Sequence, residues 1–252
     1  MNGSPTIDAA AIAALAHGEA MGLLETELQR TLDMLDGLDV DAWAARTDCP
    51  DWDVRQMYLH VLGACAGSAS IREGLHQMRA ASARRKREGG PLEASLSAVQ
   101  VAERAALSPA ELVQQLRAIA GPTVKGRRRI PGFIRKGVKI GVDGPVVEKW
   151  KVGYLVDTIY LRDLWMHRID ACRATGNAMV LTAAHDGRIV ADVVGEWARR
   201  HGKPFDLELA GAAGGRFRAG DGEEINLDAV EFCRALAGRA PAPGLLATIV
   251  PF

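Results

Sequence analysis

The stretch Arg162-Asp163-Leu164-Trp165-Met166-His167-Arg168-Ile169-Asp170 combines an apolar helical segment with polar groups that need partners. Asp163 and His167 are four residues apart, so on a helix both side chains point from the same face. A carboxylate and an imidazole at this spacing are a common way to present two ligands to a metal ion. Asp170 is spaced to accept the second ring N–H of His167 and fix its tautomer.

An earlier segment supplies a third candidate ligand. Asp53 and Gln56 form a capping box, which predicts a helix from Val54 toward Arg79 with His60 two turns inside it. Small residues follow the histidine at helical spacing and leave room for another helix or a ligand: Gly63, Ala64 and Gly67. A third ligand from a facing helix would leave one position open, as in catalytic zinc sites. The alternative for each histidine is ordinary packing or solvation.

The rest of the chain predicts a mainly helical protein. Helical periodicity and capping residues predict five helices. They cover approximately residues 5–37, 54–79, 109–120, 151–174 and 182–201. The intervening 84–106 is expected to be mostly loop with some helix. Residues 121–147 are expected to be an extended basic loop, whose length suggests a purpose such as covering a site. We place a helical bundle at residues 1–180.

The end of the chain has a different pattern. Phe205, Leu207 and Leu209 alternate with polar residues, as in a half-buried strand. Residues 216–218 and 225–227, separated by a turn, are expected to pair as a hairpin, followed by a helix from Asp228 to Gly238. We place a small α+β domain at residues 181–252.

Composition limits the class of protein. The 252 residues carry 31 Lys and Arg against 31 Asp and Glu, a balance that argues against a dedicated nucleic-acid binder. No apolar run is long enough to cross a bilayer, and the N-terminus has no basic and apolar export signal, so a cytoplasmic location is expected. The four cysteines form no CxxC pair and are expected to be reduced and buried. They are Cys49, Cys65, Cys172 and Cys233.

Three parts of the sequence resemble the mycothiol-dependent maleylpyruvate isomerase family, a branch of the DinB-like metalloproteins. They are Cys49-Pro50-Asp51-Trp52-Asp53-Val54-Arg55 with His60, the stretch 162–170, and the tail from Leu236-Ala237-Gly238-Arg239 to Pro251-Phe252. The resemblance implies a mainly α fold, a DinB-like four-helix bundle with a small α+β C-terminal domain. It also implies a divalent metal, usually zinc, on residues that match His60, Asp163 and His167. The family's isomerases carry Glu where this chain has Asp163, which leaves the isomerase activity open.

The function expected on this basis is a thiol-dependent metalloenzyme. A free thiol has a pKa of about 8.5, and coordination to a metal holds it as the reactive thiolate. Mycothiol or a similar thiol would then attack a small, anionic electrophile, in an isomerase or an S-transferase. By the resemblance Arg239 holds the substrate's anionic group, and bases within 125–139 would assist. Tyr160, one turn before Asp163, is the other candidate catalytic residue, with core packing as its alternative role.

The expected partners are the substrate and the thiol cosubstrate, without nucleic acid or membrane, in a monomer or homodimer. No residue is assigned to binding the thiol. Two other functions remain open. A metal-dependent hydrolase would use a bound water with Asp53 or Asp170 as the base, although no helical His-Glu-x-x-His motif supports it. The second is a non-catalytic helical-bundle binding module, which catalyses no reaction. Trp52 and Trp165 are expected to be core anchors.

Overall fold

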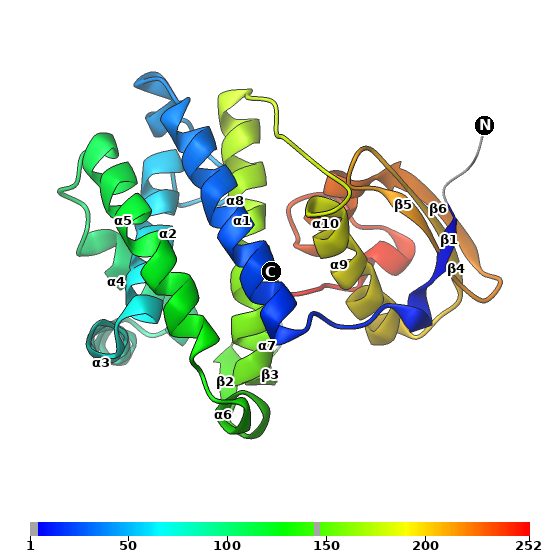
Figure 1. Ribbon diagram of the computed structural model, residues 1–252, viewed down its shortest axis with the longest axis horizontal. Coiled ribbons are helices and arrows are strands. Elements are labelled where there is room, and N and C mark those ends of the chain that lie inside the picture. The colour runs from blue at the N-terminus through cyan, green and yellow to red at the C-terminus, as the bar shows by residue number, and fades with distance from the viewer. Residues whose placement is uncertain (1–4, 144–146) are drawn as a thin grey trace. The chain divides into compact units, whose positions relative to one another are not determined.

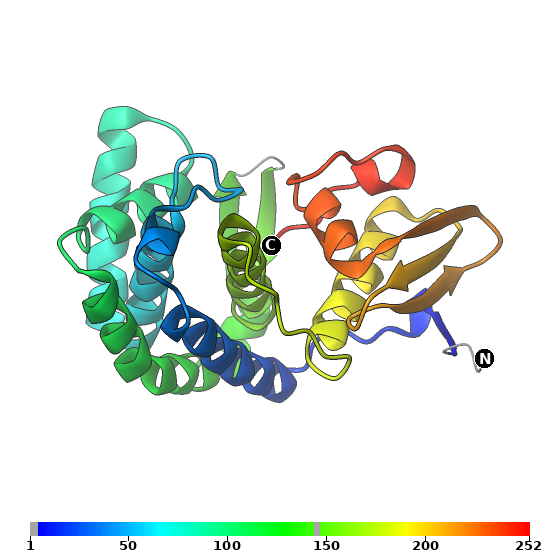
Figure 2. The ribbon, with the colours of Figure 1, turned by 90° about the horizontal axis from the view of Figure 1, so that it is seen from above.

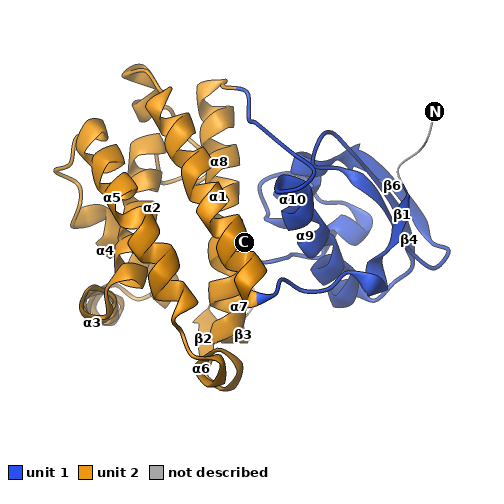
Figure 3. Cartoon of the chain, in the orientation of Figure 1, with its two compact units in different colours: residues 1–16, 178–252 blue, residues 17–177 orange. Residues whose placement is uncertain are grey.

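The computed structural model describes residues 5–143 and 147–252, which form two compact units (Figure 3). One unit is His17–Asn177, and the other joins Met1–Ala16 to Ala178–Phe252. The first unit is a helical bundle and the second contains a mixed sheet, so the predicted fold class is confirmed. Among the described residues, no helix is both long and apolar enough to cross a membrane.

The bundle unit is built on four long helices (Figure 1). They are α1 (His17–Asp36), α2 (Val54–Ala69), α5 (Pro109–Arg128) and α8 (Tyr160–Thr175). Helices α1 and α2 each contact both α5 and α8, so the four helices close around a common core. The leucines that predicted the amphipathic first helix are all buried, as are most residues of α8. The capping boxes predicted for α2 and α5 are both present.

The remaining elements of this unit lie beside these four helices. They are η2 (Asp41–Ala44), α3 (Ile71–Glu88), α4 (Leu92–Ala102), α6 (Gly132–Gly137), β2 (Lys139–Asp143), β3 (Val147–Lys151), α7 (Val152–Tyr154) and η3 (Leu155–Ile159). The predicted loop at 84–106 is therefore wrong, and so is the loop at 121–147 over its described residues, since 144–146 lie outside the part of the chain that the structure describes. Helix α5 continues through Pro122, because an exposed proline ring can be tolerated in a helix that tertiary packing supports. Beyond it, β2 and β3 pair as an antiparallel hairpin.

A buried ion pair between Arg168 and Glu27 connects α8 to α1. Arg168 Nε and Nη2 donate to the two carboxylate oxygens of Glu27 at 2.6 and 2.9 Å, and both side chains are buried. Directly before α8, η3 makes a π-helical turn, a form often found beside functional sites. The ion pair and the turn together fix the rotation of α8, the helix that carries Asp163 and His167.

The second unit has a four-stranded sheet in the order β1-β5-β4-β6. Its three later strands are the gold and orange strands in Figure 2. Its elements are β1 (Thr6–Asp8), η1 (Ala9–Ala11), α9 (Asp186–His201), β4 (Phe205–Ala210), β5 (Gly215–Ala219), β6 (Glu223–Asp228), α10 (Ala229–Leu236) and η4 (Gly244–Ala247). Strand β4 buries Phe205, Leu207 and Leu209, as the alternation predicted, and α9 and α10 pack against the sheet.

Two sequence predictions fail in this unit. Strands β5 and β6 do not pair as a hairpin, because both pair with β4, β5 antiparallel and β6 parallel. Between β5 and β6 the chain passes from one side of β4 to the other at Gly222. A Cβ at this position would lie 2.1 Å from the carbonyl oxygen of Pro204, so only glycine fits there. The first helix begins at His17 and not at Pro5, because Thr6–Asp8 pairs in parallel with β5.

Candidate metal centre

The first candidate ligand, His60, lies on α2 with its ring between two aromatic neighbours. Trp52 stacks on it at 5.0 Å between ring centroids, and the His167 ring meets it edge-on at 5.6 Å. Trp52 is half-buried against the imidazole, so the expectation that it anchors the core is wrong for this residue. Trp165 is fully buried and does have that role.

The other two candidates face His60 from α8. Asp163 Oδ2 lies 3.8 Å from His60 Nε2, and Asp163 Oδ1 lies 3.3 Å from His167 Nε2. One ligand atom from each of the three residues falls within 4.8 Å of the others. The side chain of Asp163 is 33% exposed and that of His60 13%, whereas His167 is 3% exposed. The cluster is therefore closed behind His167 and reached by solvent at Asp163.

Charges within the cluster shift two pKa values in opposite directions. Burial alone would raise the pKa of Asp163, but the neighbouring His167, and to a lesser degree His60, hold it well below its usual range. Burial alone would lower the pKa of His167, but Asp163, and to a lesser degree Asp170, raise it well above its usual range. Without a cation the pair is thus a carboxylate facing an imidazolium.

The arrangement fits a divalent metal. Within the described residues, neither ring nitrogen of the buried His167 makes a hydrogen bond of good geometry. The contacts of 3.3 to 3.8 Å among the three residues also exceed ordinary hydrogen-bond lengths. Two imidazole nitrogens and one carboxylate form the ligand set of catalytic zinc sites, which keep a fourth position for water or substrate. A metal ion would be held by His60, Asp163 and His167.

A chain of side-chain amides fixes the tautomer of His60. The Gly63 carbonyl can only accept, so Gln77 Nε2 donates to it at 2.9 Å and Gln77 Oε1 accepts from Gln100 Nε2 at 2.9 Å. The remaining Gln100 oxygen accepts from His60 Nδ1 at 2.8 Å. The proton of a neutral His60 is therefore on Nδ1, and the lone pair of Nε2 faces Asp163 and is available to a metal.

Close helix packing brings this amide chain to the histidine. A Cβ at Gly63 would lie 2.5 Å from the Cβ of Gln100, so only glycine lets α4 come this close to α2. The room predicted beside His60 is thus used by a neighbouring helix. Gln77 and Gln100 are functional candidates that the sequence analysis missed, because isolated glutamines on separate helices give no local signal.

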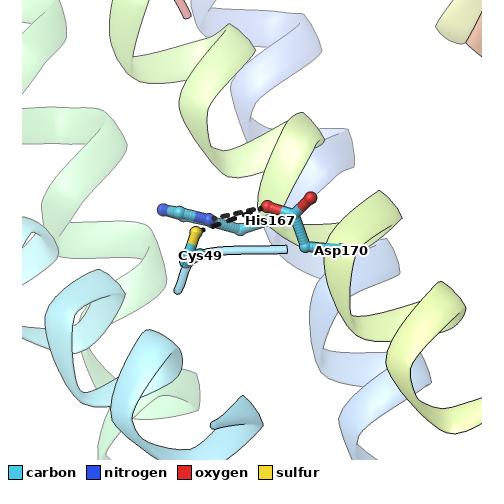
Figure 4. A group of neighbouring side chains, drawn as sticks. All are labelled: Cys49, His167 and Asp170. Carbon is cyan, nitrogen blue, oxygen red and sulfur yellow. Dashed lines mark hydrogen bonds and ion pairs between the residues drawn. The ribbon is translucent and has the colours of Figure 1, made fainter. Parts of the chain in front are cut away.

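A second group of polar side chains lies on the other side of His167 (Figure 4). Asp170 Oδ2 is 3.5 Å from His167 Nδ1 and accepts from the Cys49 thiol at 3.7 Å. Asp170 is therefore near the ring nitrogen for which its spacing predicted it. Cys65, Cys172 and Cys233 are buried as expected, but Cys49 is half-buried, and the prediction is wrong for it. The ligand atoms of Cys49, His167 and Asp170 also lie within 4.8 Å of one another.

The two candidate catalytic residues lie in different units. Tyr160 begins α8, is half-buried, and stacks beneath the guanidinium of Arg127 at 4.1 Å. Arg127 belongs to α5, within the segment expected to be a loop, and was not singled out as an individual residue. Arg239 follows α10 in the sheet-containing unit, where its N–H donates to the carbonyl of Arg234. Its role toward the substrate stays a prediction.

Comparison with known proteins gives a consistent result. The family pattern of the mycothiol maleylpyruvate isomerase N-terminal domain matches residues 24–172, which include all three candidate ligands. Two crystal structures of the mycothiol-dependent maleylpyruvate isomerase, one of a point mutant, are similar over 90% of both chains. Their TM-score is 0.56 and their sequence identity is 14% for the mutant and 15% for the other, so the similarity concerns the fold. No curated protein matches the sequence.

Proposed function

The chain belongs to the family of the mycothiol maleylpyruvate isomerase N-terminal domain, and from this premise we propose that it is a metal-dependent enzyme that uses a low-molecular-weight thiol. The thiol is mycothiol or a similar compound, and the reaction is isomerisation of, or S-transfer to, a small anionic electrophile. The observation that carries the proposal is the convergence of the ligand atoms of His60, Asp163 and His167 within 4.8 Å.

The residues of the cluster have separate roles in this proposal. A divalent ion bound there supplies the Lewis acidity that keeps a thiol ionised at neutral pH. His60 offers Nε2 because Gln100 holds the proton on Nδ1. Asp163 supplies a negative charge and lies at the solvent-reached side, where thiol and substrate arrive. Trp52 covers one face of the His60 ring and limits access of water to it.

The geometry favours the thiol enzyme over a hydrolase. A hydrolase needs a free base beside the attacking water. The carboxylate of Asp53 accepts the Gln56 N–H at 2.7 Å as the cap of α2, and Asp170 is buried beside Nδ1 of His167, away from the exposed Asp163. Both candidate bases are therefore already engaged.

Metal analysis of the purified full-length protein and its variants tests the proposal. We expect stoichiometric zinc in the wild type and loss of zinc in His60→Ala and His167→Ala. His76→Ala is the matched control, because His76 is an exposed helical histidine paired with Glu103 outside the cluster. Turnover of chlorodinitrobenzene, and of a cis-configured unsaturated dicarboxylate, is then measured with and without added thiol.

The outcomes separate the candidate functions. Product formation that needs both zinc and thiol supports the proposal, and the substrate consumed separates S-transfer from isomerisation. Turnover that needs zinc but no thiol would instead indicate a hydrolase. A protein that binds no zinc under any loading condition would leave the binding module as the better interpretation.

A further inference from the structure

Arg127 is a buried cation on the inner side of α5. It is 4% exposed, and within the described residues it forms no ion pair with a carboxylate. Its Nε donates to Ser68 Oγ at 3.1 Å, and its guanidinium carbon lies 4.1 Å from the centre of the Tyr160 ring. A buried charge without a counter-ion is energetically costly, so its presence calls for an explanation.

The packing around Arg127 holds the guanidinium in one orientation. A Cβ at Gly126 would lie 2.2 Å from the carbonyl oxygen of Ser68, so glycine lets α5 approach α2 at this point. Ser68 in turn donates to the Ala64 carbonyl at 2.9 Å, which leaves its oxygen to accept from Arg127. One edge and one face of the guanidinium are thus occupied by Ser68 and Tyr160.

The remaining edge is available to a ligand. Nη1 and Nη2 make no hydrogen bond to the described residues, and neither is among the polar atoms sealed from solvent without a partner. These two nitrogens form the fork that binds a carboxylate through two parallel hydrogen bonds.

The charges near Arg127 also favour an anion. Burial raises the pKa values of Cys65 and Tyr160, so both groups are neutral at neutral pH. Asp163 is the carboxylate whose charge acts on Arg127, although it is not in an ion pair with it. A divalent ion on Asp163 would neutralise that charge and leave Arg127 with a larger need for an anion.

The two residues that hold the guanidinium lie on the same helices as the candidate ligands. Tyr160 precedes Asp163 by three residues on α8, a rise of about 4.5 Å, and Ser68 follows His60 by eight residues on α2, a rise of about 12 Å. Arg127 is therefore held from positions about one to two helical turns from the candidate ligands, a separation that suits a ligand with a short carbon chain.

We propose that Arg127 binds the carboxylate of a small ligand whose reactive end lies at His60, Asp163 and His167. This inference rests on the proposed function and narrows its substrate class to carboxylates with a short spacer before the reacting atom. It assigns to a residue of the bundle the anion-holding role that the resemblance implies for Arg239.

Thiol binding to the cobalt-loaded full-length protein tests the assignment. The probes are mercaptocarboxylates of three to six carbons and the neutral mercaptoalcohols of equal length, titrated by the thiolate-to-cobalt absorption band. In the wild type we expect one spacer length at which the carboxylate binds at least about tenfold tighter than the alcohol. Arg127→Met should remove this preference, and Arg127→Lys should keep part of it.

Arg129→Met is the matched control, because Arg129 is exposed two residues further along and should leave the preference unchanged. Melting temperatures separate the proposed role from a purely structural one, because replacing a structural arginine would lower the melting temperature. No ion pair is lost in Arg127→Met, so we expect it to unfold at a temperature no lower than that of the wild type. If Arg127→Met nevertheless fails to fold, Ser68→Ala removes the anchor of Nε and should reduce the preference.

Three results would overturn the inference. One is neutral and anionic thiols binding equally to the wild type at every length, which would leave the proposed function standing. Another is a carboxylate preference that survives Arg127→Met. If no thiol binds cobalt, the proposed function fails, and calorimetric titration with succinate then tests Arg127 alone. Succinate that binds the wild type but not Arg127→Met would support the inference. The third overturning result is succinate that binds both proteins equally or does not bind the wild type.

Discussion

Single residues in this protein act through partners that are distant in sequence. His60 and His167 could be singled out as candidate ligands because each lies in an apolar helical segment where a polar group needs a partner. Gln100, which orients His60, was not predictable, because its importance comes from the approach of α4 to α2 at Gly63. Arg127 was expected only as one of the bases within 125–139, because its segment was expected to be a loop and its burial on a helix was not foreseen. Local patterns identify the candidate ligands but not the groups that position them.

The orienting role of Gln100 predicts a loss of metal affinity on mutation. Gln100→Leu removes the acceptor of the Nδ1 proton, so Nε2 is no longer held as the available nitrogen, and we expect zinc affinity to fall about 10- to 100-fold. Competition with a chromophoric chelator measures the change. Gln114→Leu, at an exposed position on α5, is the control and should bind zinc as the wild type does. Equal affinities in both variants would contradict the role.

Zinc affinity should also depend on pH through His167. Its pKa in the metal-free protein is raised above 6.5, mainly by Asp163 against the opposing effect of burial, and zinc must displace that proton. Asp163, with its lowered pKa, stays ionised and adds no competition. Below the pKa of His167 the affinity should therefore fall about tenfold per pH unit.

Stability of the metal-free protein should move in the opposite direction. A raised histidine pKa contributes stability that is complete below about 6.5 and is lost as the pH rises through the folded value. Urea titrations of the metal-free protein from pH 6 upward measure it, and His167→Ala should flatten the trend. For the preceding prediction, a zinc affinity that does not change with pH from 6 upward would mean that His167 is not a ligand.

At the scale of elements, local signals predicted some helix boundaries, but the helix predicted from Val54 toward Arg79 is two helices, because α2 ends at Ala69 and Ser70 caps α3. The capping boxes at Asp53 and Ser108 and the stops at Gly176 and Gly202 are where the sequence predicted them. The predictions failed where tertiary packing overrides a local signal. Pro122 inside α5 is the clearest case. The sheet order was also unpredictable, because β6 does not pair with β5, the strand before it, but lies on the other side of β4.

The contact between α1 and α8 should carry a large part of the bundle's stability. Glu27→Ala removes the carboxylate to which the buried Arg168 donates two hydrogen bonds, and we expect the free energy of unfolding to fall by about 3–5 kcal/mol, measured by urea denaturation. The control is Asp36→Ala, which breaks an exposed pair with Arg117 and should cost about 1 kcal/mol or less. Similar losses in the two variants would contradict this account.

At the scale of the whole molecule, the three candidate metal ligands lie within one unit, His17–Asn177. Zinc at a hundredfold excess over its dissociation constant should therefore stabilise this unit by about 2.7 kcal/mol. Hydrogen exchange measures the effect, with slower exchange expected in α2 and α8 and little change in the β4–β6 sheet. His60→Ala should abolish the difference, and stabilisation that persists in that variant would place the metal elsewhere.

The pairing of β1 with β5 has a consequence for synthesis in the cell. Thr6 pairs with Arg216, so β1 leaves the ribosome long before its partner strand is translated. The helical unit lies entirely between the two and can fold during that interval, since domains generally fold as units as they emerge. Throughout this wait β1 is an unpaired strand, and its length of only three residues limits the chance that it pairs with another nascent chain.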